Sequence, residues 1–362
     1  MKLWRRASGA LKDRNSIWLA SLSRRTPLRN PNIESAVIKA TNHDESRVDY
    51  RNSQRVFTWI RLSPAYLRPF IWALCTRMEK TRSWVVALKG LMLMHGVFCC
   101  KVPSVQRIGR LPFDLSNFKD GHLNPVQAWG YNAFVRAYYA FLDQKSAFIF
   151  MDLQERKGRT KETEEKPMLQ ELSRLQKLQV LLDLLFQIKP LDDGMNMSLI
   201  LEAMDCIIIE IYDIYSRICN AIARLLMRIY SAGKAEATAA LRVLQKAIIQ
   251  GEELSLYFEF CRDIGVLNAS EYPKVEQIPE EDIREVERII NGVSQGTNMK
   301  NWVPQEDNAI IVARESGRVN EGNNAKSGLK TIITDNWENP SEPDLSAWSV
   351  KWAVCGCDFH LY

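Results

Sequence analysis

The side chains that could carry catalysis or ligate a metal are few and widely separated in this chain of 362 residues. Its histidines are His43, His95, His122 and His360. No two of them have metal-ligand spacing, and the cysteines offer only an adjacent pair, Cys99-Cys100, and an isolated C-x-C at Cys355. The sequence contains no glycine-rich phosphate loop, nucleophile elbow or H-E-x-x-H motif. We therefore predict a protein that is not an enzyme and that uses no cofactor and no metal.

Basic residues could bind an anionic partner, and they are concentrated at the N-terminus. The net charge is +5, but residues 1–30 alone carry +7, so the rest of the chain carries −2. Asp13 is the single acid among these residues. The basic ones are Lys2, Arg5, Arg6, Lys12, Arg14, Arg24, Arg25 and Arg29. Because the remaining body is slightly negative and lacks interleaved basic and aromatic residues, we predict no nucleic-acid partner.

The N-terminal segment, residues 1–31, also has the periodicity of an amphipathic helix. Its apolar stripe consists of Leu3, Ala7, Leu11, Trp18 and Leu22, with Trp4 beside them. Such a helix binds at a membrane interface, because its apolar groups reach the acyl boundary while its cations meet anionic headgroups. We predict a membrane-inserting leader that depends on Leu3, Trp4, Arg5, Arg6, Lys12 and Trp18. A disordered tail and an organelle transit peptide are the alternatives.

Long amphipathic helices must position these residues, because apolar residues recur at three- and four-residue spacing over most of the chain. Helices are predicted at 33–41, 48–62, 66–78, 84–99, 128–151, 169–188, 197–230, 235–261 and 279–290. No comparable run alternates with period two, and prolines fall between the runs. The sequence therefore predicts an all-α bundle or solenoid, with residues 32–290 as one helical domain.

Three segments have a different character. Gln154–Lys166 has no apolar side chain and is predicted to be a solvated linker. Residues 291–362 are rich in asparagine and glycine, and we expect a disordered tail whose best docking candidate is Pro343–Leu345 with Trp348. The apolar run Trp84–Cys100 is short and contains Lys89, so we predict a buried helix and not a membrane span. The scattered cysteines fit a reducing compartment.

Several blocks of sequence, in order, resemble the ANTH domain of clathrin-assembly adaptor proteins. They are Ile38–Asp44, Ser83–Lys89 with His95, Phe113–Phe118, Tyr131–Tyr138 and the late segment Cys261–Pro279. The sequence of Arg82–Gly96, with Cys99–Pro103, is most similar to the plant branch of the family. The resemblance implies an ANTH-type helical superhelix, a solenoid, over residues 32–290, followed by a disordered C-terminal tail.

The resemblance also implies a phosphoinositide site. In the family, the headgroup of phosphatidylinositol 4,5-bisphosphate meets a lysine and, ten residues later, a basic residue, any residue, a second basic residue and a His or Tyr. Lys39 and Arg51 match this motif, whereas Asp49 and Asn52 stand at its other two positions. Arginines four residues on either side of Arg51 would share its face on a helix and partly compensate. The predicted headgroup-binding residues are therefore Lys39, Arg51, Arg47 and Arg55. An ordinary solvated face is the alternative for the arginines.

Two classes of function stay open. The first is a peripheral-membrane adaptor in clathrin-mediated endocytosis, at the cytoplasmic face of coated pits and vesicles and at the Golgi. Its partners would be phosphatidylinositol 4,5-bisphosphate or another anionic lipid, and clathrin heavy chain. The second is a SNARE-binding or other protein-interaction scaffold, in which helices over Met197–Cys261 hold a partner helix in a groove. Leu181–Leu185 resembles a clathrin box, but it lies in a strongly apolar helix and is predicted to be core.

Overall fold

The computed structural model describes residues 2–157, 167–229 and 232–270, together with helical positions 280, 283, 284, 287, 288, 290 and 291. Over these residues the chain is all-α and forms no strand. Its helices are α1 (Lys2–Ser21), α2 (Pro31–Ala40), α3 (Tyr50–Leu62), α4 (Leu67–Lys80), α5 (Trp84–Cys99), α6 (Pro125–Lys157), α7 (Met168–Phe186), α8 (Ser198–Arg228) and α9 (Lys234–Asp263). The predicted all-α fold is therefore confirmed.

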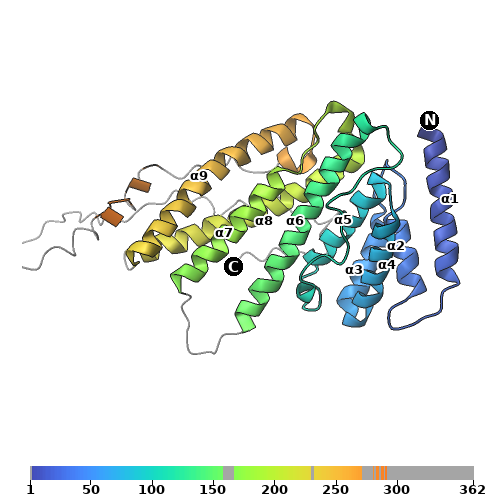
Figure 1. Cartoon of the computed structure of the whole chain (residues 1–362), viewed down its shortest axis with the longest axis horizontal. Helices are drawn as coiled ribbons and strands as arrows, with labels where there is room; N and C mark the ends of the chain where they lie inside the picture. Colours follow the sequence, from blue (N-terminus) through green and yellow to red (C-terminus); the bar gives the residue numbers. More distant parts are fainter. Residues whose placement is uncertain are drawn as a thin grey trace, which may run out of the picture.

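Helix α5 lies at the centre of the N-terminal half because its sequence is apolar on every side. All of its residues from Trp84 to Phe98 are buried, which is the pattern of a helix enclosed by neighbours. It contacts α2, α3 and α4 toward one end of the molecule and α6 and α8 toward the other (Figure 1). The predicted buried helix is confirmed, and none of the described helices has the length and hydropathy of a membrane span.

The C-terminal half continues the stack through long helices that pack on one another. Helix α6 contacts α5 and α7, and α7 in turn contacts α8 and α9. In Figure 1 the helices follow one another along the long axis, with α1 alone at one end. Leu181, Leu182 and Leu185 of α7 are buried, so the box-like sequence Leu181–Leu185 contributes to the core, as predicted.

The predicted linker Gln154–Lys166 is wrong for its first four residues, because α6 continues through Lys157. Charged pairs hold this last turn where apolar contacts are absent. Arg156 pairs with Asp152 at 2.8 Å, one turn earlier, and Lys177 of α7 reaches Glu155 at 3.5 Å. Residues 158–166 lie outside the described part of the chain. The predicted disordered tail from residue 292 onward also lies outside it, with the docking candidate Pro343–Leu345 and Trp348.

Candidate functional site

Helix α1 packs against α2 at one end of the long axis of the molecule (Figure 1). Among its residues 7–21, whose side chains are described, the buried ones are Gly9, Asp13 and Ala20, which share one face of the helix. Glycine is needed at this crossing, because a Cβ on Gly9 would lie 2.6 Å from the Cβ of His43. The alternative of a disordered N-terminal tail does not hold for residues 2–21. The helix docks on the body through small and polar residues.

Asp13 is the polar centre of this contact. Its Oδ1 accepts from Nη2 of Arg77 at 2.6 Å and from Nδ1 of His43 at 2.9 Å, and its Oδ2 accepts from the His43 backbone N–H at 2.9 Å. Burial alone would raise the pKa of the Asp13 carboxyl, but the bonds from His43 and Arg77 lower it below its usual range. Sequence reasoning missed this role, although a lone acid among eight cations was a visible signal.

The opposite face of α1 is apolar and exposed. Leu11 and Trp18 on the helix, and Leu22 directly after it, are 66%, 59% and 62% exposed. At about 100° per residue these three positions lie within a narrow stripe on the side away from Asp13. The described part of the predicted apolar stripe therefore faces solvent, and no other residue that the structure describes covers it. The side chains of residues 1–6 lie outside the described part, which includes those of Leu3, Trp4, Arg5 and Arg6.

Cations lie beside this stripe. Among the N-terminal residues whose side chains are described, 7–31, the exposed cations are Lys12, Arg14, Arg24 and Arg25. Arg29 is instead held against the body, where it donates to Glu34 through Nε at 3.1 Å and Nη2 at 3.0 Å. Its guanidinium also lies 4.4 Å from the ring centroid of Trp72. The charge available to an outside partner is therefore that of the remaining leader residues.

The motif that begins at Lys39 has an acidic setting in this structure. Lys39 is half-buried at the end of α2 and lines a cavity of about 400 Å³ together with Asp13, Asp44 and Asp49. Asp49 is the N-cap of α3: its carboxylate accepts from the Asn52 backbone N–H at 3.1 Å and from the Asn52 side-chain amide at 2.7 Å. Asp49 and Asn52 thus hold each other in place, and both have a structural role.

The predicted arginines do not all lie on one helical face. Arg51 and Arg55 are exposed one turn apart on α3, and the guanidinium of Arg55 lies 5.2 Å from the Trp59 ring centroid. Arg47 precedes the helix, because the Asp49 cap starts α3 at Tyr50. The expectation that Arg47 shares a helix face with Arg51 is therefore wrong. Arg47 is 82% exposed and lies 3.6 Å from Asp44.

Lys89, the one charged residue of α5, fixes the loop between α2 and α3. Its Nζ donates to Oδ1 of Asn42 at 2.7 Å and to the backbone oxygens of Asp44 at 2.6 Å and Arg47 at 2.7 Å. Burial lowers the pKa of Lys89 to about 8, although nearby carboxylates, Asp44 first among them, act in the opposite direction. A buried ammonium with three acceptors thus determines where the Lys39 and Arg51 segments lie relative to each other.

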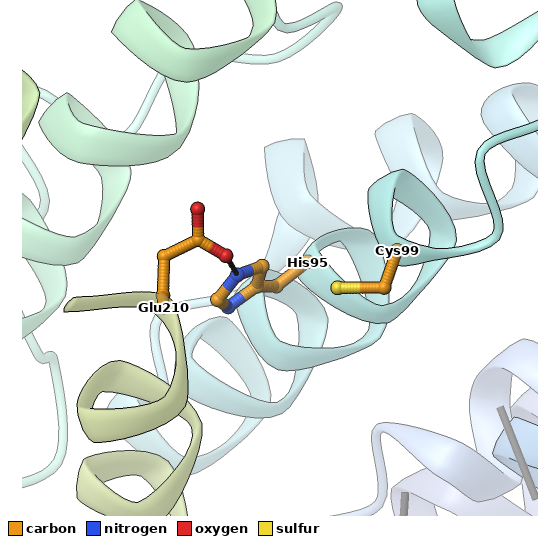
Figure 2. A group of neighbouring side chains, drawn as sticks. All are labelled: His95, Cys99 and Glu210. Atoms are coloured by element: carbon orange, nitrogen blue, oxygen red, sulfur yellow. Dashed lines mark hydrogen bonds and ion pairs between the residues drawn. The ribbon is translucent and has the colours of Figure 1, made fainter. Parts of the chain in front are cut away.

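A second polar cluster, His95, Cys99 and Glu210, is enclosed between α5, α6 and α8 and has the donor types of a metal site (Figure 2). His95 Nε2 lies 3.1 Å from Oε2 of Glu210, and His95 Nδ1 lies 2.9 Å from the hydroxyl of Tyr138. Sequence reasoning missed this group, because Glu210 is far from the other two along the chain. The His95–Cys99 spacing of one helical turn was its only local signal.

The ammonium of Lys145 holds the position that a metal ion would need in this cluster. Its Nζ lies 2.5 Å from Glu210 Oε2 and 3.5 Å from His95 Nε2. Burial acts against the charged forms, yet the Lys145–Glu210 pairing raises the pKa of Lys145 and lowers that of Glu210. Burial and the same ammonium lower the pKa of His95, which is consistent with a neutral ring. The cluster is a charge-paired support between helices.

The fold and the exposed surface define an α-helical solenoid with an outward-facing amphipathic helix at one end. Comparison with known proteins identifies its family: the ANTH domain matches residues 32–292. Two Arabidopsis thaliana proteins, both named "Putative clathrin assembly protein", are similar over most of their length. One is 53% identical over 343 residues, which covers 93% of this chain and 87% of the relative. The other is 47% identical over the same coverage. This chain belongs to the ANTH-domain family.

Proposed function

We propose that this protein is a peripheral-membrane adaptor in clathrin-mediated endocytosis, which binds phosphoinositide-containing anionic membranes and promotes clathrin coat assembly. Its family and the names of its relatives support the role in clathrin assembly. The outward apolar stripe of α1, formed by Leu11, Trp18 and Leu22, is the observation that carries the membrane part of the proposal. The site of action would be the cytoplasmic face of coated pits and vesicles, and of the Golgi.

The proposed attachment combines apolar insertion with charge. Each large side chain of the stripe gains about 1.5–3 kcal/mol when it leaves water for the acyl boundary. Each exposed basic residue near an anionic leaflet adds about 1 kcal/mol, and salt weakens this part. Lys12, Arg14, Arg24 and Arg25 of the leader, with Arg51 and Arg55 of α3, are exposed cations that would supply it. Lys39 and Arg47 would contribute to the same positive surface.

Sedimentation with liposomes tests the membrane proposal. The Trp18→Ser/Leu22→Ser double variant should lose most of its binding to vesicles that contain phosphatidylserine and phosphatidylinositol 4,5-bisphosphate. Leu256→Ser is the matched control, because Leu256 is 66% exposed on α9, far from α1 along the helical stack. Full binding by the double variant would refute the proposal. The other part of the proposal, the role in clathrin coat assembly, is tested by whether a column of the full-length protein retains clathrin heavy chain.

A protein-interaction scaffold is the second candidate function. Ile249 and Leu256 on α9 are exposed and lie seven residues apart, so they share one helical face that a partner helix could cover. A vesicle SNARE helix is the partner that the family resemblance implies. Its capture by wild-type protein and by the Trp18→Ser/Leu22→Ser variant, but not by Leu256→Ser, would favour this function over membrane attachment.

A further inference from the structure

Helix α1 has a cavity along each of its two flanks, and the charges that line them differ in sign. On the flank that faces the end of α2 and the start of α3, the cavity is lined by Lys39 and by three carboxylates, those of Asp13, Asp44 and Asp49. With Asp13 paired to Arg77 and Asp44 close to Arg47, Lys39 is left beside the carboxylate of Asp49, so this flank offers a phosphate no net positive charge. The segment with the matching motif is therefore an unfavourable place for a polyanion in this chain.

The other flank, which faces the end of α4, has the opposite character. Its cavity has a volume of about 690 Å³ and is lined by the cations Lys12, Arg77, Lys80 and Arg82, with Arg29 at its edge. Among the described residues, Glu34 is the single carboxylate in this lining, and it is neutralised by Arg29. We call this cavity the basic groove. Lys12, Lys80 and Arg82 are exposed, so their charges point to solvent and not into an internal ion pair.

Hydrogen bonds between the segment after α4 and the loop before α6 fix the rim of the basic groove. The carbonyl oxygen of Arg82 accepts from the Gly121 N–H at 2.8 Å and contacts Nδ1 of His122 at 3.0 Å. The carboxylate of Asp120 accepts from the backbone N–H groups of His122 at 2.7 Å and of Trp84 at 2.8 Å. These bonds fix the end of α4 against the loop before α6. The cations at the rim therefore extend from a rigid base, which suits recognition of a compact anion.

The position of Lys12 relates the basic groove to the membrane surface. Lys12 follows Leu11 of the outward stripe and precedes the buried Asp13, so at about 100° per residue it lies on the flank between them. When the stripe lies at the acyl boundary, the groove beside it is at the depth of the lipid headgroups. Ammonium and guanidinium groups from α1 and α4 would then meet a phosphorylated headgroup from two sides.

We propose that the basic groove between α1 and the end of α4 binds an inositol ring that carries more than one phosphate, and that Lys12, Lys80 and Arg82 are its phosphate ligands. The proposal deepens the proposed membrane function and rests on it for the source of the ligand, a lipid headgroup. A soluble inositol polyphosphate presents the same chemistry and is the alternative source. The Lys39 flank then contributes loop structure, but not the phosphate-binding pocket.

Calorimetric titration with soluble inositol 1,4,5-trisphosphate tests the groove without any membrane. The Lys80→Gln/Arg82→Gln variant should bind at least tenfold more weakly than the wild type. Arg242→Gln/Arg262→Gln is the matched control, because it removes two exposed arginines from α9, to which neither proposal assigns a part in anion binding. Thermal unfolding should be the same for all three proteins. The proposal is overturned if the wild type does not bind, or if the control loses affinity and the groove variant does not.

Liposomes separate this inference from the proposed function. If Trp18→Ser/Leu22→Ser keeps its affinity for the soluble trisphosphate but no longer sediments with vesicles, both proposals stand. Sedimentation with plain phosphatidylserine vesicles, without any trisphosphate binding, would leave the membrane proposal in place and overturn the groove. Trisphosphate binding by a protein that ignores every vesicle would keep the groove, assign it to a soluble ligand and refute membrane attachment.

Discussion

Replacing Asp13 with alanine should release α1 from the body and leave the remaining helices folded. The helix is held mainly by this carboxylate, because the other buried residues of its docking face, Gly9 and Ala20, offer little apolar area. Arg77 and His43 supply the three hydrogen bonds that Asp13 accepts, from 2.6 to 2.9 Å. The rest of the core is far larger and contains none of these groups, so the loss should be local.

The size of the effect follows from what each partner loses. A hydrogen bond to a charged group contributes about 1.5–3 kcal/mol, but the three bonds do not add in full. Arg77 keeps its bonds to the Thr41 carbonyl oxygen at 2.9 Å and to the Thr41 hydroxyl at 3.2 Å, and His43 regains water. We expect a loss of about 2–4 kcal/mol in docking free energy, which raises the undocked fraction roughly 30- to 700-fold.

Hydrogen exchange measured by mass spectrometry checks this expectation. Peptides from α1 should exchange faster in Asp13→Ala by about the same factor, while peptides from α5 should not change. Asp114→Ala is a control at an exposed carboxylate whose partners, Ser116 in its own loop and Tyr139 of α6, are not part of the α1 contact. Unchanged protection of the α1 amides, or equally faster exchange in α1 and α5, would show that Asp13 is not the residue that holds α1 on the body.

Acid should release α1 in the same way, and the sign follows from the lowered pKa of Asp13. A carboxyl with a lowered pKa in the docked state stabilises docking fully above its ordinary value of 3.8, and this contribution is lost as the pH falls below it. The protection factor of the α1 amides, which corrects for the intrinsic pH dependence of amide exchange, should therefore fall on acidification in the wild type. It should stay constant with pH in Asp13→Asn, which has no proton to take up.

Three further variants test the contact between α1 and the body and the two buried charged groups. Gly9→Ala should also loosen α1, because the new Cβ meets His43 at 2.6 Å, and faster exchange confined to α1 would show it. Lys89→Met should lower the midpoint of thermal unfolding, since three buried acceptors lose their donor. In the wild type, but not in this variant, the free energy of unfolding should gain with pH from about 8 toward 10.5, because unfolding then takes up a proton. Glu210→Gln should cost about 3–5 kcal/mol in denaturant titration by leaving the Lys145 ammonium buried without its counter-charge. If Glu210→Gln lowers the free energy of unfolding no more than a substitution at an exposed position does, the Lys145–Glu210 ion pair is contradicted.

Most of the helical pattern could be predicted from the sequence because apolar periodicity reports burial directly. Trp84–Cys99 was predicted with its observed bounds, since a run that is apolar except for Lys89 and His95 lies between Ser83 and Lys101. The end of α6 was missed for the opposite reason. Residues 154–157 have no apolar side chain, and their helix is held by pairs such as Arg156 with Asp152. Periodicity cannot report a turn that is stabilised by charge.

The candidate site was only partly predictable, because its decisive contacts join residues far apart in the chain. The sequence predicts the stripe through Leu11 and Trp18, and the structure places it outward. It could not show that Asp13 would meet Arg77, or that Lys12 would face Lys80 and Arg82 across a groove. The sequence shows an acid at position 49 of the motif, but only the structure shows that Asp49 is the N-cap of α3.

The way in which α1 docks is itself an argument for an outside partner. An amphipathic helix of a water-soluble domain normally turns its apolar side to the core. Here the apolar side, with Leu11 and Trp18, is exposed, and a buried carboxylate and small residues hold the helix in place. This orientation gives up several kcal/mol of apolar burial that the opposite face would have gained. The loss is recovered only when another apolar phase covers the stripe, and the cations beside it favour one with an anionic surface, which is the property of a cytosolic membrane leaflet.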